Sequence, residues 1–528
     1  MTFAGSLSAQ SVLGGNTFIT VLGVVVILIT LFVLAQLADS LLQVEASKQG
    51  LDGSKHKVSI IPSWKDLFGN RKPGYVGNNL MFSLHRGYNI KLRGVPAREL
   101  KDANSTRYAI QPPNFRGIAP IPKLMVEIGQ SVKAGDPIFF DKSNPDILYV
   151  APVSGEVVEV NRGAKRAITE VVILADKEQQ HKKFTAPELG KASREDLVKF
   201  LTSSGAWPLI IQRPFDIVPD VNEVPDNIFI STFSTAPLAA DRGFLLQGKE
   251  ADFHKGLEVL TALTSGKVYL GLSANDKEAP AKVFTDAAAE KVYFKGPHPA
   301  GNVGIQMHHI SPIGAKGMVW TVGVQDVATI GSLFTKGIFD SSRILALSGA
   351  PFTKPSYIRT NLGANVGEVT SGMLDNEKIR YVSGDVLSGH EKSADQYVDW
   401  RSEQITTLKE GDYYEMFGWL LALKPRPSIS HTYPTAFIPG ISYEADTNTH
   451  GEKRAFVVTG QYESVLPMDI YPQQLFKSIV MKDIEQMEGL GIKELSEEDV
   501  ALCEFVCTSK QPLQHLLREG LDIIEEQS

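Results

Sequence analysis

The most constraining feature of this sequence is an uncharged apolar run near its N-terminus. Residues 18–38 read FITVLGVVVILITLFVLAQLA and carry no charged side chain. As a helix they extend over roughly 31 Å, against a bilayer hydrocarbon core of roughly 30 Å. A cleaved signal peptide normally begins with basic residues, but no charged side chain precedes Asp39. We therefore predict an uncleaved membrane anchor; a core helix of a large protein is the alternative that such a run also allows.

The charges that flank this run predict its orientation. No Lys or Arg precedes it, and the basic residues that follow it closely are Lys48, Lys55, Lys57, Lys65, Arg71 and Lys72. By the positive-inside rule, the short tail lies outside and the main body faces the cytoplasm. The stretch from the anchor to about Leu84 is rich in Gly, Pro, Asn and Lys, which predicts a tether with one short helix at residues 63–68.

Composition limits what the rest of the chain can be. Its 528 residues predict three or four domains, and 43% hydrophobic residues are enough to build cores. A formal net charge of -7 argues against nucleic acid as the main partner. Two cysteines cannot form a disulfide framework.

After the tether, short alternating strands separated by glycine turns predict a barrel-sandwich of the lipoyl or biotinyl type. The hairpin that carries the cofactor lysine in such carriers corresponds to FFDKSNPDILYVAPVSG, where Lys142 stands nine residues before Ala151. This spacing is wrong for a carrier, so we interpret Lys142 as structural and the module as a docking or scaffold unit. In the NRGAKR turn, Arg162, Lys165 and Arg166 form either an anion or partner site or a solvated turn, and the latter is favoured.

From about residue 186, helical and strand patterns alternate, which predicts a Rossmann-like α/β domain. PELGKASREDLVKFLTSSG and ADFHKGLEVLTALTSG are predicted helices, and VPDNIFISTF and KVYLGLSAND are predicted buried strands. A nucleotide cradle needs glycines between strand and helix. At the expected places stand SGAWPLIIQRPFD and STFSTAPLAADRG, in which bulky Trp207, Leu209 and Ile210 block close approach. The fold is therefore expected without its phosphate cradle.

Three histidines gather in GPHPAGNVGIQMHHI: His298, His308 and His309. A metal site is conceivable, but no carboxylate or thiol lies at the usual ligand spacing, and adjacent histidines in an extended run point to opposite faces. We interpret them as loop and hydrogen-bonding residues.

Several motifs together resemble one family. In order and spacing, DKSNP, APVSGEVVEVNRGAKR, REDLVK, ALTSGKVY, GPHPAG, LKEGDYYEMFGW and EEDVALCEFVC look like the A subunit of the Na⁺-translocating NADH:quinone oxidoreductase. The resemblance runs from about Leu84 to the C-terminus. Residues 343–372 also look similar to the β-grasp ligand-binding module of two related proteins, the cluster-carrying C subunit of the Rnf complex and the flavin-binding subunit of respiratory complex I.

This resemblance implies a function and a location. The family's complex has six subunits in the bacterial inner membrane and passes electrons from NADH through flavins and an iron centre to quinone while it exports Na⁺. The A subunit is its cytoplasmic member, without a tightly bound redox cofactor, and its partners include the membrane subunit with the quinone site. The first 83 residues depart from the family pattern, and a tether of this kind raises the effective concentration beside membrane partners.

The resemblance leaves the two cysteines as core residues. Ser496 stands three residues before Asp499, which predicts a helix N-cap, and Val500, Cys503 and Cys507 recur on one helical face. A four-iron cluster needs four thiolates, and this chain has two. We predict no catalytic residue and no metal site, and name no cofactor-binding residue.

The expected organisation is multidomain α/β. The predicted parts are an anchor and tether (1–83), a barrel-sandwich domain (84–182), a Rossmann-like domain (183–340), a β-grasp module (341–395), a β-rich connection (396–455) and a helical C-terminal domain (456–528). The favoured function is a non-catalytic subunit of the Na⁺-pumping complex, adjacent to the quinone site. The alternative is an independent, membrane-tethered ligand-binding protein without a respiratory partner.

Overall fold

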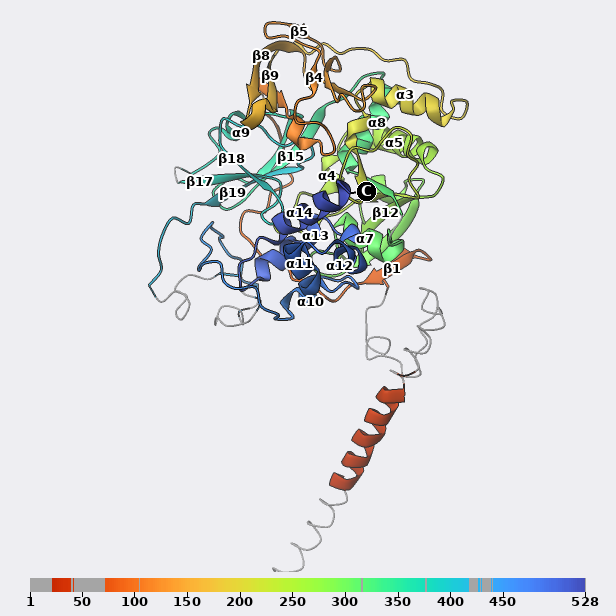
Figure 1. Ribbon diagram of the computed structural model, residues 1–528, viewed down its shortest axis with the longest axis vertical. Coiled ribbons are helices and arrows are strands. Elements are labelled where there is room, and N and C mark those ends of the chain that lie inside the picture. Colours follow the sequence, from red (N-terminus) through yellow and green to blue (C-terminus); the bar gives the residue numbers. More distant parts are fainter. Residues whose placement is uncertain are drawn as a thin grey trace, which may run out of the picture. The chain divides into compact units, whose positions relative to one another are not determined.

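The computed structural model describes residues 21–38, 41, 72–103, 105–314, 317–375, 378–416, 426–427, 429, 438 and 440–527. The chain divides into two compact units, Met1–Pro73 and Gly74–Ser528. In the first unit, Val21–Ala38 form one helix with a mean hydropathy of 2.8 and no buried residue, drawn in red in Figure 1. This helix is long and apolar enough to cross a membrane, as the sequence predicts. The predicted short helix at 63–68 lies outside the described residues.

The second unit is built around a sheet that we call the parallel sheet. Its strand order, among the described residues, is β1 (Leu80–Ser83), β13 (Glu290–Lys295), β12 (Val268–Ser273), β11 (Ile228–Ser231), β14 (Val319–Val322) and β10 (Ile210–Arg213). Neighbouring strands are parallel except for the pair of β10 with β14. Both faces of the sheet are covered, because Tyr293 packs in one core while its neighbours Val292 and Phe294 pack in another.

Helices of the α/β segment cover these faces. The described ones are α3 (Arg194–Ser203), α4 (Arg242–Leu245), α5 (Glu250–Leu263), α6 (Lys282–Thr285), α7 (Val303–Ile310) and α8 (Val324–Thr335). Buried residues of α3, α5 and α8 share the first core, whereas Ile305 of α7 lies in the second. A Cβ on Gly331 of α8 would lie 1.8 Å from the Asp252 carbonyl oxygen of α5, so the two helices cross with their backbones in contact.

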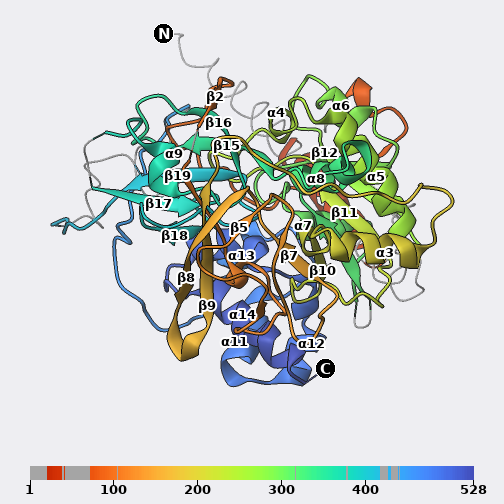
Figure 2. The ribbon, with the colours of Figure 1, turned by 90° about the horizontal axis from the view of Figure 1, so that it is seen from above.

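A second sheet, which we call the mixed sheet, lies beside this domain. Its order is β18 (His390–Lys392), β17 (Ile379–Ser383), β19 (Gln404–Lys409), β15 (Ser342–Ser348), β16 (Ser356–Asn361) and β2 (Leu100–Asp102). The short helix α9 (Val366–Thr370) follows β16. Figure 2 shows β15 to β19 of this sheet in teal and cyan, on the opposite side of the unit from α5.

Two small antiparallel sheets form the segment between β2 and α3. One has the order β3 (Arg107–Ile110), β9 (Ile168–Ala175), β8 (Gly155–Arg162) and β5 (Ser131–Val132); the other has β4 (Lys123–Leu124), β6 (Pro137–Phe140) and β7 (Leu148–Val150). Their inward residues, such as Phe139 and Val157, are fully buried. The sequence predicts this arrangement of short strands with alternating buried and exposed residues, separated by glycine turns.

The C-terminus is helical, as predicted. It contains α10 (Gln461–Val465), α11 (Pro472–Met481), α12 (Ile484–Gly489), α13 (Glu497–Val506) and α14 (Leu513–Glu525), drawn in blue in Figure 1. Their buried faces join α7, β1 and β13 in the second core. These helices therefore cover one face of the parallel sheet.

The sequence predictions for the α/β segment are confirmed at α3, α5, β11 and β12. One expectation is wrong: the strand pattern does not begin only after Leu84. Leu80–Ser83 already form β1, which pairs in parallel with β13. Four residues at a sheet edge carry too short a pattern to stand out beside a glycine-rich tether.

Candidate functional site

A cavity of about 810 Å³ opens at the carboxyl ends of the central strands of the parallel sheet. After β11 the chain continues to β12 and β13 on one side, then returns to β14 on the other side of β11. Such a reversal of strand order leaves a crevice in which open α/β sheets bind their ligands. Ser231 ends β11 and Val322 ends β14, and both line the cavity.

The other walls come from distant parts of the second unit. The mixed sheet contributes residues 383–390 and 399–404, the C-terminal helices contribute the first turns of α13 and α14, and the small-sheet segment contributes Asn114 and Arg116. This convergence makes the cavity the best candidate site in the described part of the chain.

Arg213, the last residue of β10, is the centre of a buried ionic cluster on this wall. Only 6% of its side chain is exposed, and its Nε lies 2.5 Å from Asp216 Oδ1. Its Nη2 lies 3.4 Å from Glu498 Oε1 and its Nη1 lies 3.7 Å from Asp499 Oδ2, at the N-terminus of α13. The cluster therefore ties the parallel sheet to the C-terminal helices.

Glu497 extends this cluster between two more arginines. Its Oε1 lies 2.7 Å from Arg116 Nη2 and accepts from Arg518 Nε at 2.8 Å, and its Oε2 accepts from Arg116 Nη1 at 3.1 Å. Burial opposes its ionisation, but the hydrogen bond from Arg518 and the two guanidinium charges prevail and lower the pKa of Glu497 to about 2. Glu497 is therefore ionised at every physiological pH.

The neighbouring carboxyls behave in the opposite way. Burial and the charge of Asp499 raise the pKa of Glu498 to about 7, although Arg213 opposes the shift. Burial likewise raises the pKa of Asp499. Since both pKa values are raised, this pair takes up a proton at a pH close to neutral.

The carboxylate of Asp499 lies against the first turn of α7. A Cβ on Gly304, in the first turn of α7, would lie 2.1 Å from Asp499 Oδ2. Asp499 is 1% exposed, and its Oδ2 accepts from both the backbone N–H and the hydroxyl of Ser496. Because helix N-termini carry partial positive charge, this carboxylate adds negative charge close to the start of α7.

The N-terminus of α8 carries its own carboxylate. Asp326 lies in the first turn of α8, is buried, and pairs with Arg343 Nη2 at 2.6 Å. Burial raises the pKa of Asp326, and the charge of Arg343 opposes that shift. Asp326 and Asp499 therefore place negative groups at the N-termini of α8 and α7.

Three further wall residues carry unpaired donors. His298 Nε2, Trp400 Nε1 and Arg401 Nε are buried and have no hydrogen-bond partner within the described residues. Arg401 donates to the carbonyls of Asn114 at 3.2 Å and Pro208 at 2.7 Å. These three nitrogens are buried behind the cavity surface, and Asp216 Oδ1 of the same wall is likewise buried without a hydrogen-bond partner among the described residues.

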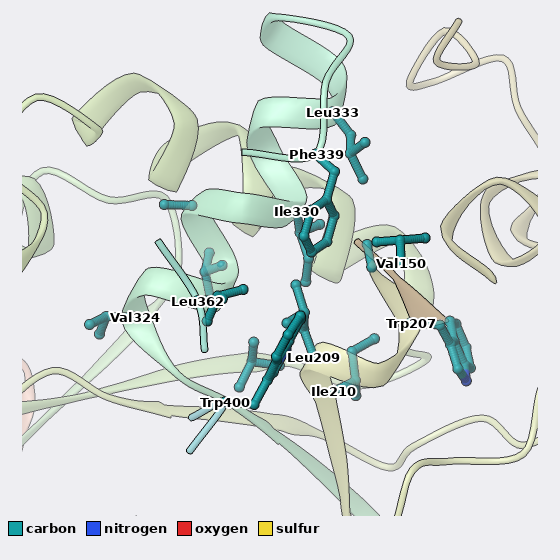
Figure 3. Packing of buried hydrophobic residues seen from close by; sticks show 14 of the residues in the cluster. Val150, Trp207, Leu209, Ile210, Val324, Ile330, Leu333, Phe339, Leu362 and Trp400 are labelled. Atoms are coloured by element: carbon teal, nitrogen blue, oxygen red, sulfur yellow. The ribbon is translucent and has the colours of Figure 1, made fainter. Parts of the chain in front are cut away.

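The bulky residues that were expected to exclude a phosphate loop lie in the core. Trp207, Leu209 and Ile210 are fully buried, and Figure 3 shows them in one packed group with Val150 and Trp400. Trp207 Nε1 donates to the Pro219 carbonyl at 2.8 Å. Trp207, Leu209 and Ile210 therefore pack behind the wall of the cavity and do not line it.

The structure places the three histidines differently from the expected loop. His308 and His309 lie on α7, so the interpretation of residues 296–310 as a loop is wrong from Val303 onward. The glycines at 301 and 304 favoured a loop in the sequence, but a helix begins here with Asn302 as its N-cap. All three have hydrogen-bond partners, as expected: His298 Nδ1 with Thr235 Oγ1 at 3.2 Å, His308 Nε2 with Asp469 N at 3.2 Å and His309 Nε2 with the Pro467 carbonyl at 2.8 Å.

Both cysteines are buried in the second core, as predicted. Cys503 lies on α13, and the Ser496 cap of that helix is confirmed. Cys507 is the C-cap rather than a helical residue, and its Sγ lies 2.9 Å from Tyr462 Oη. Burial raises the pKa of the Cys503 thiol far above its usual range. Within the described ranges, no group of three or more His, Cys, Asp or Glu side chains is placed to hold a metal.

The other residues singled out in the sequence lie away from the cavity. Lys142 is exposed in the connection between β6 and β7. Arg162, Lys165 and Arg166 are exposed at the β8–β9 turn, where Arg162 donates to the Arg166 carbonyl at 3.0 Å. Neither place brings a second functional group to these side chains.

Comparison with known proteins identifies the family. Three family models match: the NqrA N-terminal barrel-sandwich hybrid domain over residues 82–176, the NqrA second alpha/beta domain over 192–339 and the NQRA C-terminal domain over 344–394. The A subunit of the Na⁺-translocating NADH-quinone reductase of Hahella chejuensis is 36% identical over 452 residues, which cover 85% of this chain and 100% of the relative. The chain belongs to the NqrA family.

Other NqrA relatives give the same result. Those of Saccharophagus degradans and Vibrio atlanticus are 37% and 35% identical, again over 85% of this chain and all of theirs. The match confirms the predicted barrel-sandwich domain at the N-terminal end of the body. Among solved structures, an NAD⁺-reducing [NiFe]-hydrogenase in the air-oxidized state covers 57% of this chain and 55% of its own at 10% identity and a TM-score of 0.29, too low for an argument.

Apart from His298 and Ser496, the residues of the cavity wall were not singled out by the sequence alone. Arg213 and Asp216 stand in QRPFD, a stretch considered only for its lack of glycine, and Glu498 stands 285 residues away. The available signal was an Arg-x-x-Asp pair that follows the apolar run at residues 207–211. Charges at the end of a core strand need partners when they are buried.

Proposed function

We propose that this chain is the cytoplasm-facing A subunit of a bacterial Na⁺-translocating NADH:quinone oxidoreductase complex, anchored in the inner membrane by one N-terminal helix. The carrying observation is the match to NqrA relatives over their whole length. In this proposal the complex has six subunits, uses NADH, flavins, an iron centre, quinone and Na⁺, and couples electron transfer to Na⁺ export. The partner closest in function is the membrane subunit with the quinone site.

The chain itself is proposed to be non-catalytic and to bind no redox cofactor. Two observations support this. The carboxylate of Asp499 lies against Gly304 in the first turn of α7, and its negative charge disfavours a nucleotide phosphate there. Cys503 and Cys507 are buried as thiols with protein partners.

The proposed architecture follows the predicted boundaries. A Rossmann-like domain at 183–340 is supported by the run of parallel strands β13, β12, β11 and β14. A β-grasp module at 341–395 is supported by the strands and short helix β15, β16, α9 and β17. The anchor and tether end before β1, whose residues Leu80–Ser83 belong to the parallel sheet; the barrel-sandwich lies within 84–182, the connection occupies 396–455 and the helical domain 456–528.

Purification from native membranes tests the proposal. A tag at the C-terminus should co-isolate flavin-containing membrane subunits that reduce quinone with NADH in a Na⁺-dependent manner. The chain dissociated from them in detergent should be colourless. Isolation of a lone chain would favour the independent ligand-binding protein, and a stoichiometric flavin spectrum or bound iron on the dissociated chain would refute the cofactor-free role.

A further inference from the structure

Two turns of the small-sheet segment meet at one end of that segment. The turn between β6 and β7 contains Asp141, whose carboxylate accepts from the Ala119 N–H at 3.2 Å. The carbonyl of the next residue, Pro120, accepts from the N–H of Ile168, the first residue of β9, at 3.1 Å. Ala119 and Pro120 therefore lie between the β6–β7 turn and the β8–β9 turn, and the exposed side chains of both turns belong to one surface.

This surface, which we call the basic end, carries five exposed cations: Lys123, Lys142, Arg162, Lys165 and Arg166. None of them forms an ion pair with a carboxylate within the described residues. Residues 118–128, 141–147 and 161–168, which build the basic end, contain three carboxyls, and one of these, Asp141, is only 2% exposed. In a chain with a formal net charge of -7, the basic end is thus a positive surface whose cations remain available to a partner.

The β8–β9 turn holds two of these cations in an uncommon backbone conformation. Lys165 and Arg166 have positive φ angles of 52° and 64°, which residues other than glycine adopt rarely. Arg162 Nη1 donates to the Arg166 carbonyl at 3.0 Å, and the Gly163 N–H donates to the Ala167 carbonyl at 2.8 Å. Such conformations persist where the surroundings hold them, and they cluster at functional sites. The backbone of this turn therefore presents Lys165 and Arg166 in a defined arrangement.

Large apolar side chains are exposed beside the cations. Ile121 is 40% exposed, Met125 46% and Ile128 65%. Exposure alternates along residues 121–126, so Ile121, Lys123 and Met125 share one outward face of an extended segment. An exposed apolar patch with a charged rim is typical of a surface that binds another protein.

We propose that the basic end docks an acidic protein partner, a cytoplasmic segment of another subunit, whose carboxylates pair with the cations around an apolar contact at Ile121 and Met125. This inference rests on the proposed membership in the respiratory complex. Anionic lipid is the other occupant that this chemistry fits, but the position of the surface disfavours it. The tether joins the second unit before β1, whereas Figure 1 shows β4, β8 and β9 at the opposite end of that unit from β1. The end that is joined to the anchor is therefore not the basic end.

Acetylation of lysines tests which partner covers the basic end. The full-length chain is acetylated alone in neutral detergent, alone in nanodiscs that contain phosphatidylglycerol, and within the purified complex in neutral detergent. Lys142 and Lys165 should react at least about tenfold more slowly in the complex, the protection that corresponds to contacts of roughly 1.4 kcal/mol. They should react at equal rates in the other two states. Lys277, exposed in the connection between β12 and α6, is the reference and should react equally in all three.

Charge reversal tests the residues. A chain with Arg162→Glu, Lys165→Glu and Arg166→Glu is produced in equal amount beside an unmodified chain that carries a different tag. The unmodified chain should enter the complex at least about ten times more often. The matched control reverses three exposed cations that lie outside the basic end and form no ion pair within the described ranges, as Lys101→Glu, Lys277→Glu and Lys354→Glu. This control chain should enter the complex as often as the unmodified chain.

Carbodiimide cross-linking of the complex tests the acidic character of the partner. It should join Lys142 or Lys165 to an Asp or Glu side chain of another subunit. Protection of both lysines without any such cross-link would contradict an acidic partner.

The proposal fails if Lys142 and Lys165 react as fast in the complex as in the lone chain, which is the behaviour of a solvated turn. It also fails if phosphatidylglycerol alone protects them, or if a folded triple variant competes equally with the unmodified chain. Circular dichroism reports the fold of each variant, and the acetylation rates decide if the triple variant does not fold. If the chain isolates without other subunits, the proposed function fails and this inference with it; if the complex is intact, a negative result overturns only the docking surface.

Discussion

Arg213→Gln should reveal how much the buried ionic cluster contributes to the fold. The substitution keeps a polar side chain but removes the charge that lies 2.5 Å from Asp216, 3.4 Å from Glu498 and 3.7 Å from Asp499. Asp216 retains Arg116 at 3.6 Å and Arg518 at 3.7 Å. Glu498 is 39% exposed and regains water. The fully buried Asp499 loses its cationic neighbour.

The expected cost follows from this difference. Breaking a buried pair destabilises a protein by about 3–5 kcal/mol, and the partial relief of Asp216 and Glu498 places this case near about 3 kcal/mol. The pKa of the fully buried Asp499, and that of Glu498, is raised in the folded chain, so the contribution of this pair to stability is present at low pH and is lost as the pH rises through the folded-state pKa values. Without Arg213 the pKa of both carboxyls rises further. The cost of the substitution should therefore be largest above pH 7 and shrink toward pH 5.

Urea unfolding of the full-length chain in detergent measures this cost. Fluorescence of the buried pair Trp207 and Trp320, whose ring centroids lie 5.3 Å apart, reports the transition. Arg359→Gln, at an exposed pair, should change the free energy of unfolding by no more than about 1 kcal/mol at any pH. A loss below about 1 kcal/mol for Arg213→Gln at pH 8, or a loss that stays the same at pH 5, would contradict the reasoning.

Three further outcomes are expected. Gly331→Ala should destabilise the chain by about 2–3 kcal/mol in urea unfolding because its Cβ would strike the backbone of α5, whereas Gly489→Ala, with open space around it, should be neutral or stabilising by up to about 1 kcal/mol. Replacing Cys503 and Cys507 together by Ala should leave NADH-to-quinone turnover of the complex nearly intact, with a modest loss of stability from weaker packing; loss of turnover in a folded complex would refute their core role. A tag before Phe18 should be cleaved by protease added outside cells with a permeabilised outer membrane, and a C-terminal tag should be protected; two protected tags would contradict the orientation.

Local patterns predicted the elements whose partners lie close in sequence or on one amphipathic face. The helices α3 and α5 were predicted because their apolar positions repeat with helical spacing, and β11 and β12 because they are continuous apolar runs. The start of α7 was missed because glycine-rich stretches predict loops. Here Gly304 is a helical residue, and its lack of a side chain allows the close contact with Asp499.

The cavity could not be predicted, because its chemistry arises from long-range contacts. Glu498 and Arg213 are 285 residues apart, and Arg401 and Pro208 are 193 residues apart. A carboxyl such as Asp499 reads as an ordinary residue of a helix first turn, and only the fold shows that it is buried against Gly304.

The early strand β1 has a consequence for synthesis on the ribosome. Leu80–Ser83 pair with β13, which begins at Glu290, about 210 residues later in the chain. At about 5–20 residues per second, β1 waits roughly 10–40 s for its partner after it leaves the ribosome. During this interval the intervening chain must fold in such a way that the edge of β13 stays free to pair with β1. Folding of the α/β domain is thus completed by a segment made before it, and an isolated α/β fragment starting after residue 183 would expose the β13 edge to other chains.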